Sequence, residues 1–246
     1  MPGALSSEAV VDTPIRAAAA DNALPFAAGF RALMVLFGLL PFLHVTTSVV
    51  LMLAPVVWGT TYKTFLMGLA TLFLAGPLSV RLTTFVTPLH PGRFEINSRP
   101  FLLWWFTAQW QVVFNRLPFL EELLRLVPGL YSLWLRCWGA RVGRLVYWSP
   151  GLVILDRPLV DVGNRVVFGV GVRVNPHLLG PDHVNGAPRR MTLTVAPVRI
   201  GDDALVGGYS FLPPGSFVAP GEVLPGMRTL RMFSEWRDGK RQDPAR

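Results

Sequence analysis

The stretch from Ile200 to Gly226 reads IGDDALVGGYSFLPPGSFVAPGEVLPG, with an aliphatic residue at every sixth position. These positions are Ile200, Val206, Leu212, Val218 and Leu224. An amphipathic helix repeats every three to four residues and a half-buried strand every two, so neither explains this spacing. The intervening prolines and glycines also oppose a continuous helix. The pattern instead predicts short strands joined by tight turns around a three-sided prism, with one inward aliphatic residue per side.

Two earlier blocks follow the same rule. Their inward positions are Val142, Trp148 and Ile154 in the first block and Val162, Phe168 and Val174 in the second. VGNRVV and FGVGVR also repeat the aliphatic-then-glycine order of IGDDAL and VGGYSF. We therefore expect residues 140–226 to form a parallel β-helix.

The register breaks across residues 175–197, NPHLLGPDHVNGAPRRMTLTVAP. This segment is too long for a turn and too polar to be wound inside the prism, so we expect an extruded loop. It carries the only histidines of the repeat region, His177 and His183. Loops on rigid scaffolds often carry function, and imidazole titrates near neutral pH, so a functional site is expected here.

The first half of the chain is strongly apolar. Hydrophobic residues make up 51% of the chain and charged residues 15%, and residues 32–62 contain no charge. At about 1.5 Å per residue, this run exceeds the bilayer core of about 30 Å. We predict transmembrane helices over about 34–57 and, after Lys63, over about 64–86, with Arg81 reaching towards the headgroups. The alternative is a pair of buried helices in a soluble core.

Basic residues set the expected orientation. Only Lys63 lies in the hairpin tip, whereas Arg16 and Arg31 precede the spans and Arg81, Arg93 and Arg99 follow them. Both ends should therefore face the cytoplasm, in a multi-pass protein of a bacterial-type plasma (inner) membrane with its β-helix in the cytoplasm. Residues 1–24 are small and polar and predict a flexible tail. The apolar run is too long for a cleavable signal peptide.

Residues 100–139 hold five of the eight tryptophans and are interrupted by Pro118 and Pro128. Tryptophan favours the membrane interface, so we predict interfacial helices here, completing a membrane domain over 25–139. The alternative is a helical collar that packs only on itself. At the other end, residues 227–246 are predicted to cap the prism with a helix or strand around residues 230–236 and then to fray.

The net charge of +8 arises from 23 Lys and Arg against 15 Asp and Glu. Without a basic run or a nucleic-acid motif, this charge favours anionic lipid headgroups and phosphate-bearing cofactors as partners, and no nucleic acid is expected.

Together, IGDDALVGGYSFLPPG, VGNRVVFGVGVRV, the histidine-bearing loop and APVRIG resemble the hexapeptide-repeat acyltransferases, whose coils form a left-handed β-helix. The resemblance covers about residues 140–226. The membrane helices and PHLLGPDHV are also similar to the C-terminal membrane part of nonribosomal-peptide-synthetase-like proteins of the ε-poly-lysine synthetase type. No adenylation or carrier domain accompanies them here, so amino-acid polymerisation is not inferred.

The acyltransferase resemblance implies transfer of an acyl group, commonly acetyl, from acyl-CoA to a hydroxyl or amine. Membrane placement points to a lipophilic or glycan acceptor. A histidine would act as general base and a backbone amide would stabilise the oxyanion. We favour His177 as the base over His183, with Asp182 as a candidate to orient an imidazole.

The same resemblance guides the cofactor prediction. Guanidinium groups suit phosphate oxygens, so Arg189, Arg190 and Arg199 are candidates for the CoA phosphates. Gly207 and Gly208 would let the pantetheine arm approach the backbone. In this family the groove usually lies between subunits, which predicts a homotrimer.

Two alternatives remain open. A zinc site of the γ-carbonic-anhydrase kind would need three histidine ligands, but the repeats supply two, so no metal is expected. The other alternative is a non-catalytic β-helix scaffold that organises partners at the membrane.

Overall fold

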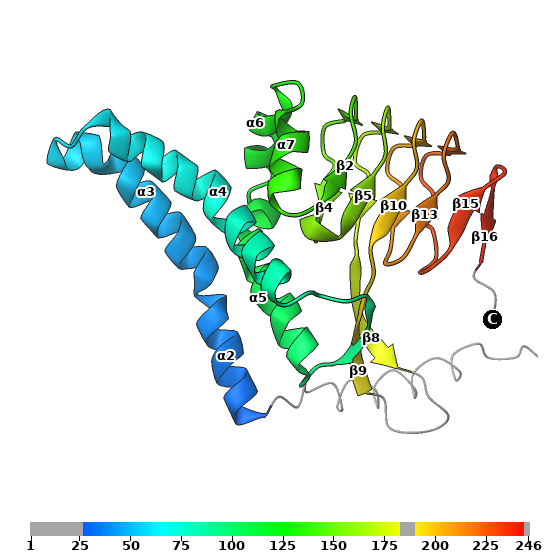
Figure 1. Cartoon of the computed structure of the whole chain (residues 1–246), viewed down its shortest axis with the longest axis horizontal. Helices are drawn as coiled ribbons and strands as arrows, with labels where there is room; N and C mark the ends of the chain where they lie inside the picture. The colour runs from blue at the N-terminus through cyan, green and yellow to red at the C-terminus, as the bar shows by residue number, and fades with distance from the viewer. Residues whose placement is uncertain (1–26, 183–189, 244–246) are drawn as a thin grey trace, which may run out of the picture.

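Helices form the first part of the chain and coiled short strands the second (Figure 1). The computed structural model describes residues 27–182 and 190–243. The helices are α2 (Ala28–Gly38), α3 (Leu40–Trp58), α4 (Tyr62–Val86), α5 (Arg99–Arg116), α6 (Phe119–Arg125) and α7 (Leu130–Cys137).

Two helical segments are long and apolar enough to cross a membrane. They span Ala28–Trp58, which includes α2 and α3, and Tyr62–Val86, which is α4. Gly59, in the left-handed conformation at φ 65°, ends α3 and begins the turn into α4. At Gly68 a Cβ would lie 2.7 Å from the Ser48 carbonyl oxygen, so this glycine lets α3 and α4 pack closely.

A proline in α4 creates a docking point for α7. Pro77 has no amide hydrogen, so the carbonyl of Phe73 lacks its usual helical donor. The Trp134 Nε1 donates to that carbonyl at 2.7 Å. One helical turn after Pro77, the Arg81 guanidinium donates to the carbonyl oxygen of Arg136 in α7 at 2.5 Å. These bonds fasten the hairpin to the helices that adjoin the coil.

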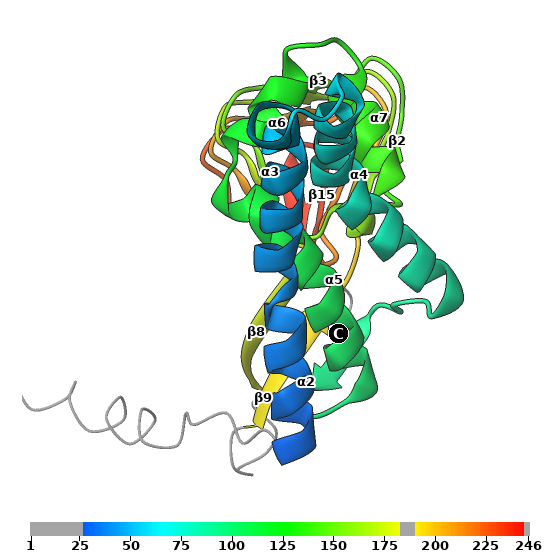
Figure 2. The ribbon, with the colours of Figure 1, turned by 90° about the vertical axis from the view of Figure 1, so that its left-hand side faces the viewer.

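Helix α5 lies between the apolar hairpin and the coil (Figures 1 and 2). Its buried side chains include Trp104, Thr107, Gln111 and Phe114, which recur at helical spacing. On another side of α5, Trp105 Nε1 donates to the carbonyl oxygen of Met34 in α2 at 3.2 Å. Helix α5 thus has packed neighbours on both sides.

The second part is a three-sided coil of parallel strands. One sheet has the order β14-β11-β6-β3, another β12-β7-β4, and the third β16-β15-β13-β10-β5-β2. The coil strands are β2 (Arg141–Val142), β3 (Tyr147–Trp148), β4 (Val153–Ile154), β5 (Val160–Val162), β6 (Val167–Phe168), β7 (Arg173–Val174), β10 (Val198–Ile200), β11 (Leu205–Val206), β12 (Phe211–Leu212), β13 (Phe217–Val218), β14 (Val223–Leu224) and β15 (Glu235–Arg237).

The predicted inward positions fill the centre of this coil. Val206, Leu212, Val218 and Leu224 are all 0% exposed, and Ile200 is 3% exposed. The corresponding positions of the two earlier blocks are also buried, apart from Trp148, which is half-buried and stacks on Phe168 with ring centroids 4.8 Å apart. The period of six therefore identified the core correctly.

The coil continues beyond residue 226, where the sequence prediction ended it. Leu230 and Trp236, the next two positions of the same period, are buried. Strand β15 pairs in parallel with β13, with Val218 opposite Trp236. The antiparallel strand β16 (Lys240–Gln242) then covers β15. Pro225 and Gly226 form another corner of the coil.

The segment 175–197 is more ordered than the predicted loop. Strands β8 (His177–Asp182) and β9 (Arg190–Val195) form an antiparallel hairpin, and β1 (Gly92–Glu95) pairs with β9. Leu193 and Val195 are buried in a cluster with Phe101 and Trp104 of α5. The alternation in MTLTV is the sequence signal for β9, and the high polarity of the segment as a whole hid it.

Candidate functional site

Two segments leave the coil at adjacent levels. Strand β4 pairs in parallel with β7, with Ile154 opposite Val174. Asp156 follows β4, and His177 follows β7 as the first residue of β8. The stacking of the coils therefore brings Asp156 and His177 together although they are far apart in sequence.

Asp156 and His177 form a buried pair, which we call the Asp156–His177 dyad. The His177 Nδ1 is hydrogen-bonded to Asp156 Oδ2. The other carboxylate oxygen, Oδ1, accepts a hydrogen bond from Trp104 Nε1 at 3.0 Å. The Trp104 ring centroid lies 4.8 Å from that of His177. Asp156 is 2% exposed, while the His177 side chain is 23% exposed and so remains accessible.

This environment changes the acid–base behaviour of the imidazole. Burial lowers the pKa of His177, but the charge of Asp156 and its hydrogen bond raise it, and the net pKa is raised above the usual 6.5. An ionised Asp156 accepts from a protonated Nδ1, which leaves the lone pair on Nε2. Among the described residues, Nε2 has no hydrogen-bond partner. The arrangement is that of an oriented base with its reactive nitrogen free.

A second buried network fixes the backbone beside Asp156. The Arg157 amide donates to Gln111 Oε1 at 2.8 Å. The Arg157 guanidinium, in a residue 1% exposed, pairs with Glu121 and donates to Asn115 at 3.0 Å. Buried ion pairs seldom add much net stability, because desolvation opposes the attraction. Their bonds do hold Arg157 in one position relative to α5 and α6.

Glu121 extends the network to α7. Its carboxylate accepts from the Tyr131 hydroxyl at 2.6 Å and from Arg125 at 3.1 Å. Burial, together with the neighbouring Glu121 charge, raises the pKa of Tyr131, so this phenol stays protonated. Helices α5, α6 and α7 are thus all joined to the short 3-10 helix η1 (Arg157–Leu159).

Among the described side chains, the carboxylate bonded to His177 is Asp156, which the sequence did not single out. Asp182 ends strand β8, where its backbone pairs with Arg190. His183 and Arg189 lie outside the described residues.

Arg199 is exposed on β10, opposite Asp161 of β5. With Arg141 and Pro158, it lines a cavity of about 290 Å³ beside η1. Arg141 lies 3.9 Å from the Asp161 carboxylate. This face of the coil therefore presents two guanidinium groups close to the segment that carries Asp156.

The predicted role of Gly207 and Gly208 has a different physical explanation. A Cβ at Gly207 would lie 2.3 Å from the backbone nitrogen of Gly226, and one at Gly208 would lie 3.0 Å from the carbonyl oxygen of Val170. At Gly207 the close approach that the structure shows is therefore between successive coils.

Sequence reasoning missed Asp156 and Trp104. Asp156 could have been found by aligning the inward positions Ile154 and Val174 of successive coils, because the chain leaves the coil shortly after each of them. Trp104 gave no such signal, since nothing in a tryptophan-rich helix singles out one indole as a hydrogen-bond donor. Within residues 27–182 and 190–243, no group of three or more His, Cys, Asp or Glu side chains is placed to hold a metal ion.

No protein-family model matches the chain, and no curated protein matches it. Similar solved structures include a hexapeptide-repeat-containing acetyltransferase from Vibrio cholerae, 15% identical, with a TM-score of 0.30 over 52% of this chain and 90% of that one. A maltose O-acetyltransferase from Clostridium difficile is 15% identical, with a TM-score of 0.27 over 49% of this chain and 79% of that one. A serine acetyltransferase from Neisseria gonorrhoeae is 16% identical, with a TM-score of 0.19 over 65% of this chain and 60% of that one. These similar structures are acetyltransferases, the class indicated by the sequence resemblance. The fold described above rests on strand register and burial, not on these similarities.

Proposed function

We propose that this protein is a membrane-bound acyltransferase of the hexapeptide-repeat type with left-handed coils. It moves an acyl group, acetyl in the simplest case, from acyl-CoA to a hydroxyl or amine of a lipophilic or glycan acceptor. The observation that carries the proposal is the Asp156–His177 dyad, held where the β8–β9 hairpin leaves the coil.

In the proposed reaction, His177 Nε2 accepts the proton of the acceptor group as its oxygen or nitrogen attacks the thioester carbonyl. The new bond to the acyl carbon forms, and the tetrahedral intermediate collapses with cleavage of the carbon–sulfur bond. The CoA thiolate then takes the proton from the imidazolium. Asp156 acts as a positioning residue that keeps the proton of neutral His177 on Nδ1 and stabilises the imidazolium while it exists.

The cavity beside η1, which is lined by two arginines and by Asp161, supports a place for the CoA phosphates. Arg199 and Arg141 line it. Guanidinium groups bind phosphate oxygens in a bidentate manner. Arg190, the first residue of β9, remains part of the proposal, as do Arg189 and His183, which lie outside the described residues. A homotrimer in which a neighbouring coil completes the CoA groove also remains part of it.

Membrane insertion is supported by the surface of the apolar helices. Val56 is 86% exposed, Phe42 67% and Phe85 84%. Only 11% and 22% of the most apolar windows of the two candidate spans are buried inside the protein. Buried helices of a soluble core would hide such side chains, whereas lipid covers them at no cost. With the basic residues at both ends of the hairpin, we place the coil in the cytoplasm, at a bacterial-type inner membrane.

The test compares His177→Ala with His90→Ala, which changes an exposed histidine outside the coil. Full-length protein in lipid nanodiscs is incubated with labelled acetyl-CoA and a cellular lipid and metabolite extract, and acetylated products are identified by mass spectrometry. We expect His177→Ala to lose transfer while keeping acetyl-CoA binding by calorimetry, and His90→Ala to resemble wild type. Full transfer by His177→Ala would refute the assigned base. Absence of acyl-CoA binding by the wild-type protein would instead favour the scaffold alternative.

A further inference from the structure

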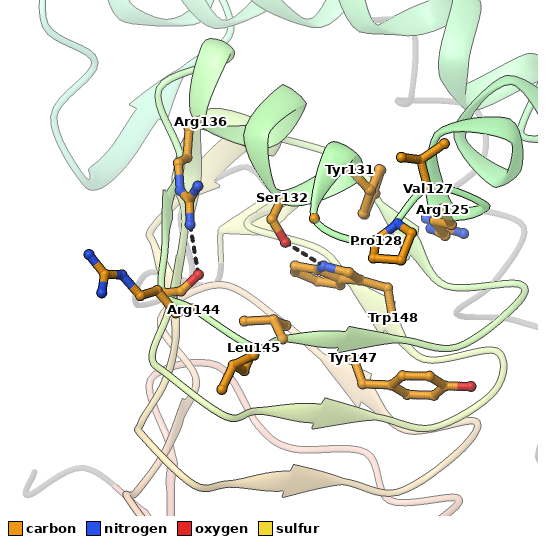
Figure 3. A pocket seen from close by; sticks show the side chains of 13 residues that line it. Arg125, Val127, Pro128, Tyr131, Ser132, Arg136, Arg144, Leu145, Tyr147 and Trp148 are labelled. Carbon is orange, nitrogen blue, oxygen red and sulfur yellow. Dashed lines mark hydrogen bonds between the residues drawn. The ribbon is translucent and has the colours of Figure 1, made fainter.

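A cavity of about 640 Å³ lies between the loop joining α6 to α7 and the first turn of the coil (Figure 3). We call it the α7 cavity. Val127, Pro128 and Tyr131 line it from the helical side, and Leu145, Tyr147 and Trp148 from the coil. Its volume falls in the range typical of sites for small organic ligands.

The surface of the α7 cavity is mainly apolar. The indole donor of Trp148 is already satisfied, because its Nε1 donates to Ser132 Oγ at 2.8 Å. Trp148 therefore offers the cavity its ring rather than a free donor. A ligand that fills this part of the cavity must be largely hydrocarbon.

The charged residues of the cavity are all basic (Figure 3). Arg136 and Arg144 lie at one side, and neither has a carboxylate partner among the described residues. Arg136 is held in place by bonds of 2.9 and 2.8 Å to the carbonyl oxygens of Val142 and Gly143. No Asp or Glu lines the cavity, so an anion at this side would meet attraction only.

A buried and incompletely satisfied guanidinium lines the opposite side. The Arg125 side chain is 6% exposed and pairs with Glu121 and Glu122, which neutralise its charge. Its Nε nevertheless has no hydrogen-bond acceptor. A buried donor without a partner costs about 1–3 kcal/mol, and because this atom is also shielded from the cavity, no ligand contact is assigned to it.

The rim of the α7 cavity contains an exposed leucine at a corner of the coil. Leu145 has φ 57°, in the left-handed region that disfavours branched side chains, and is 81% exposed. At the stacked corner of the next coil, Arg165 has a similar φ of 56° but bonds to Asp203. Like Met227 at another corner, Leu145 is exposed at a positive φ, and it places its apolar side chain at the cavity mouth.

From these features we propose that the α7 cavity binds one alkyl chain and the head group of an anionic lipid. The alkyl chain lies against Leu145, Tyr147 and Trp148, and the carboxylate or phosphate head lies at Arg136 and Arg144. The head is supplied either by a free fatty acid or by an anionic phospholipid. This site is separate from the Asp156–His177 dyad and does not depend on the proposed acyl transfer.

The experiment uses a photoactivatable palmitic acid carrying a diazirine in its chain. Full-length protein in phosphatidylcholine nanodiscs is irradiated with this probe, and labelled peptides are identified by mass spectrometry, with labelling of α3 and α4 as the internal reference for nonspecific contact. We expect labelling within residues 126–148 that dodecyl phosphate displaces and dodecanol does not. If phosphatidylglycerol in the nanodisc also displaces it, the natural source is an anionic phospholipid; if not, it is a free fatty acid.

Matched variants separate the site from the general surface. Arg144→Glu and Leu145→Asp should each reduce specific labelling about tenfold, equivalent to about 1.4 kcal/mol of binding free energy. The controls are Arg173→Glu, at an exposed arginine of β7, and Met227→Asp, at a corner with φ 59° and 82% exposure. Both controls should label like wild type. Equal labelling in all four variants, or labelling confined to α3 and α4, would overturn the proposal.

Discussion

Replacing Asp156 by asparagine removes the charge of the dyad while keeping its shape. In the native site one carboxylate oxygen accepts from Trp104 Nε1 at 3.0 Å and the other is bonded to His177 Nδ1. In Asp156→Asn the amide oxygen must face Trp104, because the indole can only donate. The amide NH₂ then faces His177 Nδ1, which can pair with it only as an acceptor. The imidazole proton moves to Nε2, the atom that should receive a proton from the acceptor substrate.

The expected loss follows from the role of that atom. Positioned general bases contribute about 10²- to 10⁴-fold to rate, so we expect kcat for acetyl transfer to fall by a factor in this range. Acetyl-CoA binding should change little, since the substitution leaves the cavity beside η1 intact. Loss of a buried charge-assisted hydrogen bond should lower the free energy of unfolding by about 1.5–3 kcal/mol. The control is Asp203→Asn, an exposed carboxylate at a corner of the coil that bonds to Arg165 and does not line the cavity beside η1.

The pH dependence gives an independent reading. The base is neutral His177, whose pKa is raised by Asp156 despite its burial. Activity should therefore fall with decreasing pH at a point above 6.5 in the wild type, and this acidic limb should move to lower pH in Asp156→Asn. For stability the sign is reversed: a raised pKa favours the folded state below the unfolded value of about 6.5, and this contribution is lost as pH rises through the folded pKa. The stability difference between wild type and Asp156→Asn should thus be larger at about pH 6 than at about pH 9.

The measurements are the acetyl-transfer rate as a function of pH and denaturant unfolding at two pH values, all in nanodiscs. A variant with kcat within about threefold of wild type and an unmoved acidic limb would contradict the assignment of Asp156 as the positioning residue, because general-base contributions are much larger than this.

Three further predictions concern stability. Trp134→Phe leaves the Phe73 carbonyl without its donor and should lower the free energy of unfolding by about 1–3 kcal/mol, measured by thermal unfolding in nanodiscs. Glu121→Gln leaves the Arg157 charge buried without a counter-charge and should lower the free energy of unfolding by about 3 kcal/mol. A smaller decrease than that of Trp134→Phe would show that the charges of the network contribute little to stability. Gly207→Ala should destabilise the coil by at least about 1–3 kcal/mol in denaturant unfolding. The added methyl group would meet the backbone of the next coil at Gly226, which cannot move aside as a flexible side chain could. An unchanged midpoint would contradict the close coil packing.

The sequence predicted the coil well because its signal is local. Every inward position from Ile200 to Leu224 could be read from spacing alone, since an aliphatic residue must fill the axis once per side. The end of the coil was missed for a physical reason: Leu230 and Trp236 keep the period, but the charged residues around them resemble a frayed tail. Inward apolar residues are hard to recognise in the sequence when the outward residues between them are charged.

The site was only half predictable. His177 stood out because histidines are scarce and one followed an inward position. Asp156 lies in a different turn of the coil, and its proximity to His177 comes from the pairing of Ile154 with Val174, which is a property of the stack rather than of either segment. Trp104 comes from a helix whose docking on the coil no local pattern specifies.

Two neighbouring indoles of α5 face different partners. Trp104 donates to the carboxylate that steers the base, while Trp105 donates to the carbonyl of Met34 in α2. Because these two tryptophans are adjacent in α5, a displacement of α2 would move this part of α5 and with it the hydrogen bond to Asp156. If α2 lies in lipid as proposed, detergents that loosen it should reduce the proposed acyl transfer while the strand coil is still intact.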